Sequence, residues 1–358
     1  MASTLNEPPV ESEASERLAD LLREVPFLAQ SRLRPEAGPR DSGVDFVVSV
    51  RSNGVDRRLL CRVKSSGQPR IARQACLELV DYARSDKKAY PVFIAPYISP
   101  AAAAICDQYN VGYLDFAGNC RLAFDKVYIR REGSPNPAVE RRDLRSLYSP
   151  KAERILRVLL TAGERTWRTQ ELADEASVSL GQVANVKKLL ADREWIDVQS
   201  AGFGLRTLEG AVLPLLQEWT ANYRASRNPA REFYSLKSIP EIEATLSEEG
   251  RKPASRIAFT GFSGAARLAP AVRYSRVTAF GGNVDALANR LGLKAVSSGA
   301  NVTLLEPYDE GVFYGTREVE GALIVSPVQI YLDLMQTKGR GEEAASAILE
   351  EAIKTVWR

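Results

Sequence analysis

Short segments rich in β-branched residues alternate with segments whose apolar residues recur at helical spacing over residues 41–130. Two strands are expected at 43–51 and 57–66, joined by a turn in which Asn53 precedes Gly54, a pair typical of tight hairpins. A helix, a strand, a second helix and a further strand follow, at 70–85, 90–97, 99–110 and 112–124. This alternation restricts the region to an α/β layer structure.

The segments on either side of this region have a different composition. The opening residues, MASTLNEPPVESEASE, are acidic and polar, without the basic start and apolar stretch of a secretion signal. We expect residues 1–40 to form a mobile tail and one leading helix, whose apolar periodicity covers 16–29. Residues 131–149 are rich in proline, serine and arginine, which is typical of a linker.

Length and composition narrow the class of protein. The 358 residues are enough for two or three domains, each with its own core. There is no histidine, which excludes histidine-dependent triads and histidine metal ligands. The four cysteines lack the paired spacing of a zinc site and are Cys61, Cys76, Cys106 and Cys120. We therefore expect reduced, buried thiols. No apolar run reaches the length of a membrane span, and we expect a cytoplasmic protein.

The pattern changes at residues 150–210. Apolar residues at helical spacing predict three helices, over 150–163, 169–178 and 179–195. Two short strand-like pieces around a glycine-rich turn follow at 196–210. A helix, a helix–turn–helix and a β-hairpin occur in this order in winged helix-turn-helix domains.

The third of these helices carries the strongest functional signal. Its inward stripe is apolar and consists of Val183, Val186, Leu189 and Leu190. Ser179 is suited to cap the start of the helix. The opposite face presents polar and basic side chains, which are Gln182, Asn185 and Lys188, with Lys187 alongside. Amides can pair with adenine edges and lysines neutralise phosphates or read guanine, so we favour DNA binding over a solvated face or a protein-interaction module.

Arginines around this helix are candidates for further phosphate contacts. Arg165 and Arg168 lie around the start of the second helix, and Arg206 follows the hairpin turn. A run of basic residues extends from the linker into the first helix and consists of Arg130, Arg131, Arg141, Arg142, Arg145, Lys151, Arg154 and Arg157. This run is either a solvated linker or a phosphate-binding stripe. The net charge of +3 does not decide between the two.

The first α/β region also contains a pattern similar to the metal site of restriction-endonuclease-like folds. In that pattern an Asp ends one strand and Glu-x-Lys or Asp-x-Lys lies on the next. Asp45 and Lys64 occupy the outer places, but Arg62 stands at the acidic position. A positive charge there would repel a divalent cation, so we expect an inactive site in a domain that holds DNA or acts as a scaffold. Glu36 or Glu78 would have to move in to restore the site, and nothing in the sequence favours this.

Mixed strands and helices follow in residues 211–358, where we expect a further α/β domain. A Gly-Phe-Ser-Gly turn between a strand and a helix contains Gly261, Ser263 and Gly264. Backbone N–H groups of such a turn can cradle a phosphate, although a tight turn without a ligand is more common.

Nucleotidyl transfer would need paired carboxylates on the next strand to hold Mg²⁺. That strand, at 275–282, contains none. Asp285 is expected in a helix and Asp309 in a turn. The sequence therefore predicts a vestigial nucleotide loop without chemistry, with no metal and no cofactor.

Taken together, the chain from about residue 40 onward resembles the AbiEi antitoxins, the transcriptional-regulator halves of type IV (abortive-infection) toxin–antitoxin systems. The phrases that carry the resemblance are VKSSGQPR, APYISPAAAAICDQYNVGYLDFAGNCRL, SPKAERILRVLL, SLGQVANVKKLL, TGFSGAARLAP, SGANVTLLEPYDEGVFYG and VSPVQIYLDL. The resemblance implies a winged helix that represses its own operon and a nucleotidyltransferase-like C-terminal domain that mediates antitoxicity. In compact members of the family the winged helix stands at the N-terminus, whereas here a nuclease-like domain precedes it.

We therefore expect a non-enzymatic DNA-binding regulator of the antitoxin type. Its expected partners are double-stranded DNA at a promoter repeat and a neighbouring nucleotidyltransferase-like toxin, which is counteracted without a stable complex; a homodimer is left open. One alternative is a nuclease that uses Asp45 and Lys64 with a displaced carboxylate. Another is a protein-interaction scaffold whose winged helix never meets DNA.

Overall fold

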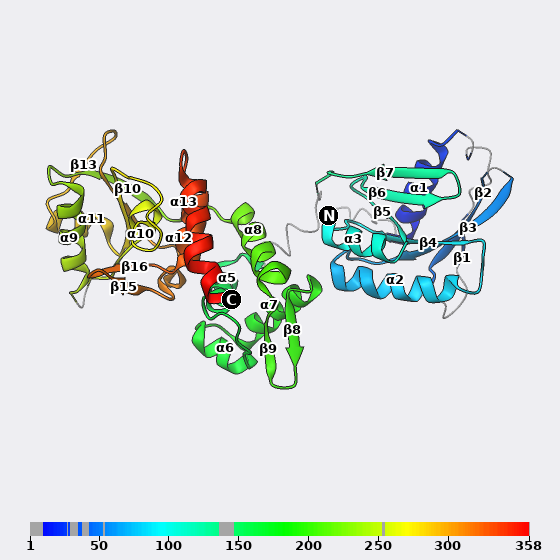
Figure 1. Ribbon diagram of the computed structural model, residues 1–358, viewed down its shortest axis with the longest axis horizontal. Coiled ribbons are helices and arrows are strands. Elements are labelled where there is room, and N and C mark those ends of the chain that lie inside the picture. Colours follow the sequence, from blue (N-terminus) through cyan, green and yellow to red (C-terminus); the bar gives the residue numbers. More distant parts are fainter. Residues whose placement is uncertain are drawn as a thin grey trace, which may run out of the picture. The chain divides into compact units, whose positions relative to one another are not determined.

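The computed structural model describes residues 10–26, 28, 35–37, 43–52, 54–135, 147–252 and 255–357 (Figure 1). The chain divides into two compact units, which are Met1–Asp143 with Ala191–Glu194, and Leu144–Leu190 with Trp195–Arg358. The expected winged-helix region (150–210) and the expected C-terminal domain (211–358) therefore both lie in the second unit, apart from Ala191–Glu194. Within the described ranges, no helix combines the length and apolar character needed to cross a membrane.

A seven-stranded mixed sheet forms the first unit, in the order β1-β2-β3-β4-β5-β6-β7. The strands are β1 (Pro35–Ala37), β2 (Phe46–Ser52), β3 (Val55–Val63), β4 (Ala89–Ala95), β5 (Gly112–Asp115), β6 (Cys120–Phe124) and β7 (Val127–Arg131). The steps β3–β4 and β4–β5 are parallel and the others antiparallel. Ser52 pairs with Val55 and Gly54 has a φ of 81°, as the predicted hairpin requires.

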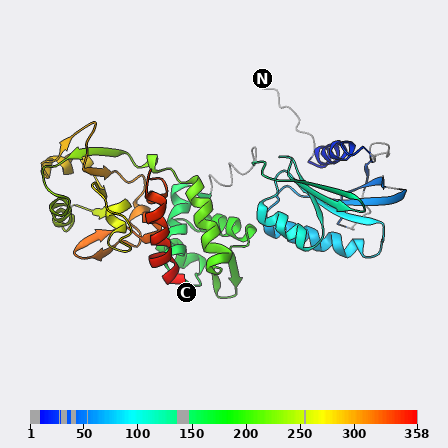
Figure 2. The same cartoon turned by 45° about the horizontal axis from the view of Figure 1, so that its top comes forward.

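Helices cover both faces of this sheet, because successive residues of a strand point to opposite sides. Val92 and Ile94 of β4 pack with α1 (Val10–Arg23), whereas Phe93 and Ala95 pack with α2 (Pro69–Ala83) and α3 (Pro100–Gln108). Figure 2 shows α1 on one face and α2 on the other. The α/β layer structure predicted for this region is what the structure has.

Three sequence predictions in this unit were wrong. The leading helix spans Val10–Arg23 rather than 16–29, so part of the expected tail is helical. It begins earlier because Ala14 extends the buried stripe of Leu18 and Leu22 toward the N-terminus. It ends earlier because Pro26 disfavours the helical conformation in the residue before it.

The other two errors concern strands. Residues 112–124 form two strands, since the carboxylate of Asp115 accepts the Asn119 N–H at 2.8 Å and closes a turn. The sequence had indicated one. β7 also extends to Arg131, where the linker was expected to begin. Residues 136–146 of that linker lie outside the described residues.

The second unit contains another seven-stranded mixed sheet, in the order β13-β10-β14-β12-β11-β16-β15. The strands are β10 (Ala230–Tyr234), β11 (Ile257–Phe259), β12 (Val277–Gly281), β13 (Lys294–Ala295), β14 (Val302–Leu305), β15 (Arg317–Val319) and β16 (Ala322–Ile324). β12–β14 and β11–β16 are parallel, and the other neighbours are antiparallel.

Helices again cover this second sheet. α9 (Ile239–Gly250) and α11 (Val284–Arg290) bury Ile242, Leu246 and Leu287 in its core. α10 (Gly261–Ala265) packs against β12 and against α12 (Pro327–Met335) and α13 (Gly341–Ile348). Short helical turns complete the unit and are η1 (Leu208–Val212), η2 (Ala225–Arg227), η3 (Glu310–Phe313), η4 (Leu349–Ile353) and η5 (Lys354–Trp357).

The remaining elements of this unit precede its sheet. They are α5 (Pro150–Thr161), α6 (Thr169–Glu175), α7 (Leu180–Asp192), β8 (Ile196–Gln199), β9 (Gly202–Leu205) and α8 (Leu213–Asn222). α12 packs against both α5 and α8, so it links these elements to the sheet.

Candidate nucleic-acid interface

The expected winged-helix region, residues 150–210, contains three helices and a hairpin in the predicted order. β8 and β9 pair antiparallel, from Ile196 opposite Leu205 to Gln199 opposite Gly202. Trp167, just before α6, bridges to Phe203 of β9 through two backbone hydrogen bonds of 2.8 and 3.0 Å. The hairpin is therefore fixed to the start of the helix–turn–helix.

Two glycines permit this close approach. A Cβ atom at Gly202, where φ is 153°, would lie 2.2 Å from the carbonyl oxygen of Trp167. A Cβ atom at Gly204 would lie 2.4 Å from the carbonyl oxygen of Arg165. The Gly-Phe-Gly sequence of the hairpin is thus a steric requirement of this contact.

Helix α7 has the predicted polarity. Its inward stripe is buried, at Val183, Val186, Leu189 and Leu190. The Ser179 hydroxyl accepts the Gln182 N–H at 3.2 Å, as the predicted cap requires. Asn185 and Lys188 are exposed, whereas Gln182 and Lys187 are half-buried. The Lys187 ammonium lies 4.9 Å from the ring centroid of Phe203, so the hairpin holds this side chain.

The three arginines proposed as phosphate contacts are all exposed. Arg165 lies over the Trp167 ring, 3.8 Å from its centroid, and pairs with Glu171. Arg206 donates to Asp197 at 2.8 Å across the hairpin. Exposed ion pairs of this kind are worth about 0–1 kcal/mol, so a phosphate can replace the carboxylate at little cost. Arg168 precedes α6, and its backbone N–H donates to Glu171.

Two members of the basic run fit neither a solvated linker nor a phosphate-binding stripe. Arg157 is fully buried, and Arg154 pairs with Asp309 through contacts of 2.6 and 3.0 Å. The reason is that α5 packs into the second unit, which directs these two arginines inward. Arg130 and Arg131 form exposed ion pairs with Glu132 and Glu24, so for them both alternatives stay open. Arg141, Arg142 and Arg145 lie outside the described residues, and Lys151 is exposed.

In the first unit, Arg62 occupies the centre of the nuclease-like pattern. Its guanidinium lies 2.9 Å from Asp45 and 3.2 Å from Glu78. The other oxygen of Asp45 accepts the Val63 N–H at 2.6 Å. The second carboxylate beside Arg62 is thus Glu78 of α2, although nothing in the sequence favoured its presence there. The side chain of Glu36 lies outside the described residues, so its approach to this place stays untested. Lys64 follows β3 and is half-buried.

Polar groups of the predicted nucleotide loop form hydrogen bonds with the backbone of the protein itself. The Ser263 hydroxyl contacts the Thr278 backbone, with distances of 2.9 Å to both its oxygen and its nitrogen. Gly264 donates its N–H to the Thr260 carbonyl at 3.0 Å. Asp285 lies in α11 and Asp309 in the turn before η3, as predicted. The carboxylate close to this loop is Asp333 of α12, which sequence reasoning missed.

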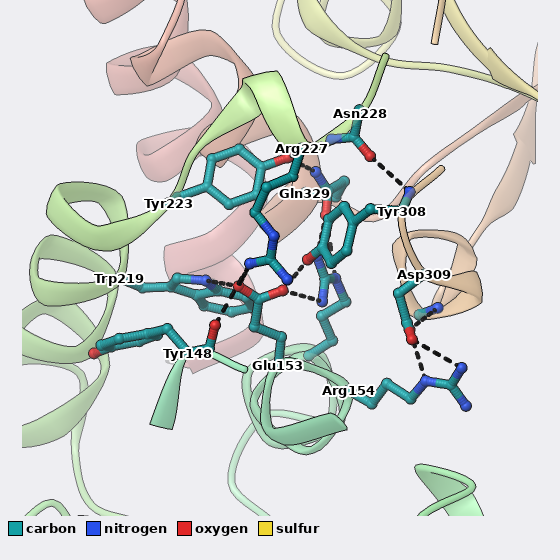
Figure 3. A network of polar contacts seen from close by, with 12 residues as sticks. Tyr148, Glu153, Arg154, Trp219, Tyr223, Arg227, Asn228, Tyr308, Asp309 and Gln329 are labelled. Atoms are coloured by element: carbon teal, nitrogen blue, oxygen red, sulfur yellow. Dashed lines mark hydrogen bonds and ion pairs between the residues drawn. The ribbon is translucent and has the colours of Figure 1, made fainter. Parts of the chain in front are cut away.

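A buried polar network connects α5 of the winged-helix region to the second sheet (Figure 3). Glu153 accepts hydrogen bonds from Tyr308 and, at 3.0 Å, from Arg227. Arg157 donates to Gln329 at 2.6 Å and to Tyr308 at 3.2 Å. Glu153, Arg157 and Gln329 have no exposed surface.

The network continues from Gln329 along α12. Its amide donates to Asp333 at 3.0 Å and to the Tyr223 hydroxyl at 2.9 Å. Tyr223 in turn donates to Asp333 at 2.7 Å, and the Thr260 hydroxyl donates to the same carboxylate at 2.5 Å. The Asn228 side chain donates to the Tyr223 hydroxyl at 3.2 Å and accepts the Tyr308 N–H at 3.1 Å.

Burial dominates the electrostatics of this network. Desolvation raises the pKa of Glu153 against the attraction of Arg157 and Arg227. Desolvation also raises the pKa of Asp333, although Thr260, Tyr223 and Gln329 stabilise its anion. The same cause lowers the pKa of Arg157. One sequence signal was present: the polar pairs Glu153/Arg157 and Gln329/Asp333 are each four residues apart in a helix, and α12 is otherwise apolar.

No group of three or more cysteine or acidic residues that can hold a metal ion occurs in the part of the chain that the structure describes. All four cysteines are buried, and all lie in the first unit.

Residues 212–354 match an antitoxin family model. The family, AbiEi_2, is described as "Transcriptional regulator, AbiEi antitoxin, Type IV TA system". The match covers α8, the second sheet and α13 but not the winged-helix region. The C-terminal half is therefore similar to this class of regulator and antitoxin, as the resemblance predicted. No curated protein sequence matches the chain.

Two solved structures are similar to part of the chain. One is the "crystal structure of a repair endonuclease from Pyrococcus abyssi", with 16% identity and a TM-score of 0.22. The other is the "Structure of EndoMS-dsDNA2 complex", with 17% identity and a TM-score of 0.22. Each match covers 32% of this chain and 49% of the other, so the chain spans about half the length of these structures.

Proposed function

We propose that this protein is a sequence-specific DNA-binding transcriptional regulator of the AbiEi antitoxin type that represses its own operon. The observation that carries the proposal is helix α7, which is capped by Ser179 and exposes Asn185 and Lys188 beside an anchored hairpin. This region directly precedes the segment that matches the regulator family. α7 enters the major groove in this proposal, and the hairpin contacts the backbone next to it.

The rest of the chain has a non-enzymatic role in the proposal. Arg62 neutralises the two carboxylates that a nuclease would need for a cation, which argues against the nuclease alternative. The antitoxin activity belongs to the C-terminal half. Its partner is a toxin encoded next to it, a nucleotidyltransferase-like enzyme that it counteracts without a stable complex.

The test is binding of the full chain to DNA upstream of its own gene, against a scrambled duplex, across a salt series with Mg²⁺ present. We expect selective binding that weakens with salt and leaves the DNA intact. Unselective binding with nicked product would instead support a nuclease, and an absence of salt-dependent binding would support the scaffold alternative.

A further inference from the structure

A cavity of about 540 Å³ opens in the C-terminal half and takes no part in the proposed DNA contacts. It is lined by β12, β14 and α10, by the chain that leads into β12, and by the end of α12 with the residues that follow it. This volume is typical of pockets that bind small molecules.

The charge of the cavity favours an anion. Four cationic side chains line it and are Arg273, Arg276, Lys338 and Arg340. Its one carboxylate is Asp333, which already accepts hydrogen bonds from three neighbours. Arg276 pairs with Glu232 and Arg340 with Glu343. Arg273 and Lys338 make no ion pair with any residue that the structure describes, so their charges are available to a ligand.

Two of the threonines that line the cavity come from neighbouring strands. Thr278 of β12 and Thr303 of β14 stand directly opposite each other in the parallel pair. The Thr303 hydroxyl is buried and lacks a hydrogen-bond partner among the described residues. A buried hydroxyl without a partner is destabilising, so a ligand atom that forms a hydrogen bond with it is favoured.

Apolar and aromatic side chains complete the lining. Phe262, Val272, Tyr274 and Leu305 contribute to it. The Tyr274 ring is held in place because its hydroxyl donates to Glu243 at 2.7 Å. A planar apolar group of a ligand can pack against such rings while its anionic end faces the cations.

We propose that this cavity binds a nucleoside phosphate, with Arg273 and Lys338 at the phosphate, Thr303 as a hydrogen-bond partner, and the aromatic side chains against the base. This binding site is separate from α7. Asn228 and Asp333 line the cavity but also belong to the buried network, so we leave them unchanged in the test below.

The experiment is calorimetric titration of the full-length protein with AMP, GMP, CMP and UMP, and with adenosine, guanosine and inorganic phosphate as the separate halves. We expect at least one nucleotide to bind with a Kd below about 1 mM. The phosphate-free nucleoside and inorganic phosphate should bind at least about tenfold more weakly, because each fills only part of the cavity.

The double variant Arg273→Glu/Lys338→Glu should lower nucleotide affinity at least about tenfold, since it replaces two attractive charges with repulsive ones. Lys294→Glu is the matched control, because Lys294 is an exposed cation of the same half outside the cavity. Both variants should melt within a few degrees of the wild type. The proposal is overturned if no nucleotide binds in this range, if inorganic phosphate binds as tightly as the nucleotide, or if the double variant binds like the control.

Discussion

The guanidinium of Arg62 lies 2.9 Å from the carboxylate of Asp45, at the place where the endonuclease-like pattern would have an acidic side chain. Glu78 approaches the same guanidinium from α2 at 3.2 Å. Positive charge therefore stands between two carboxylates, and the arrangement is an ion-paired structural element of the first unit.

Arg62→Ala should lower the free energy of unfolding of the first unit by about 1–3 kcal/mol, because it leaves two half-buried carboxylates without a counter-charge. All four cysteines are buried in this unit, so urea-dependent thiol labelling reports on its unfolding. Arg58→Ala, which breaks a more exposed pair with Asp86, is the control and should cost less than about 1 kcal/mol. Equal losses in the two variants would contradict the structural role of Arg62.

Substitutions on α7 should separate sequence reading from general affinity. Asn185→Ala and Gln182→Ala should each weaken operator binding by about 1–3 kcal/mol and leave binding to scrambled DNA nearly unchanged. Lys188→Ala should weaken binding to every sequence and reduce the salt slope by about one ion. Lys187→Ala should have a smaller effect than Lys188→Ala, since Lys187 already contacts Phe203. Operator affinity that survives all four changes would show that α7 is not the reading helix.

The buried network should be the most sensitive part of the second unit. Arg157→Ala removes one of the two guanidinium charges beside the buried Glu153 and leaves the Gln329 and Tyr308 oxygens without this donor, which should cost about 3–5 kcal/mol. All four tryptophans lie in this unit, so fluorescence during urea unfolding measures the loss. Arg231→Ala, which breaks an exposed pair with Asp285, should stay below about 1 kcal/mol. A loss for Arg157→Ala no larger than this control would mean that the network contributes little.

Asp333 should make stability of the second unit depend on pH. Because burial raises its folded-state pKa, its contribution is fully present below the ordinary carboxyl pKa of about 4 and is lost as pH rises through the raised value. The free energy of unfolding should therefore fall with rising pH in that window, and Asp333→Asn should make the fall shallower. The remaining pH dependence is expected from Glu153, whose pKa burial also raises.

Asp309→Asn is the control for this pH effect. Burial raises the pKa of Asp309, but the Arg154 guanidinium and the Gly311 N–H outweigh it, so the pKa lies below its usual value. Its contribution is lost only as pH falls through that low value. Unfolding in urea at a series of pH values from about 4 upward should thus show a uniformly less stable variant with the wild-type slope. An unchanged slope in Asp333→Asn would contradict the assignment to Asp333.

Much of the local structure followed from the sequence, because it depends on residues close together in the chain. The hairpin at Gly54, the cap at Ser179 and the buried stripe of α7 are examples. The errors arose where distant contacts decide the outcome. Arg154 and Arg157 look like members of an exposed basic run, yet packing of α5 against η3 and α12 turns them inward.

The sequence by itself determined the periodicities, the absence of histidine chemistry and the basic residue at position 62, since these depend on residue identity and spacing alone. Only the tertiary structure decided that Glu78 joins Arg62, that Asp333 bonds to Thr260 directly before the Gly-Phe-Ser-Gly turn, and that four cations line a cavity beside it. The physical reason is that hydrogen bonds and ion pairs act over a few ångströms in space, whatever the separation of their partners along the chain.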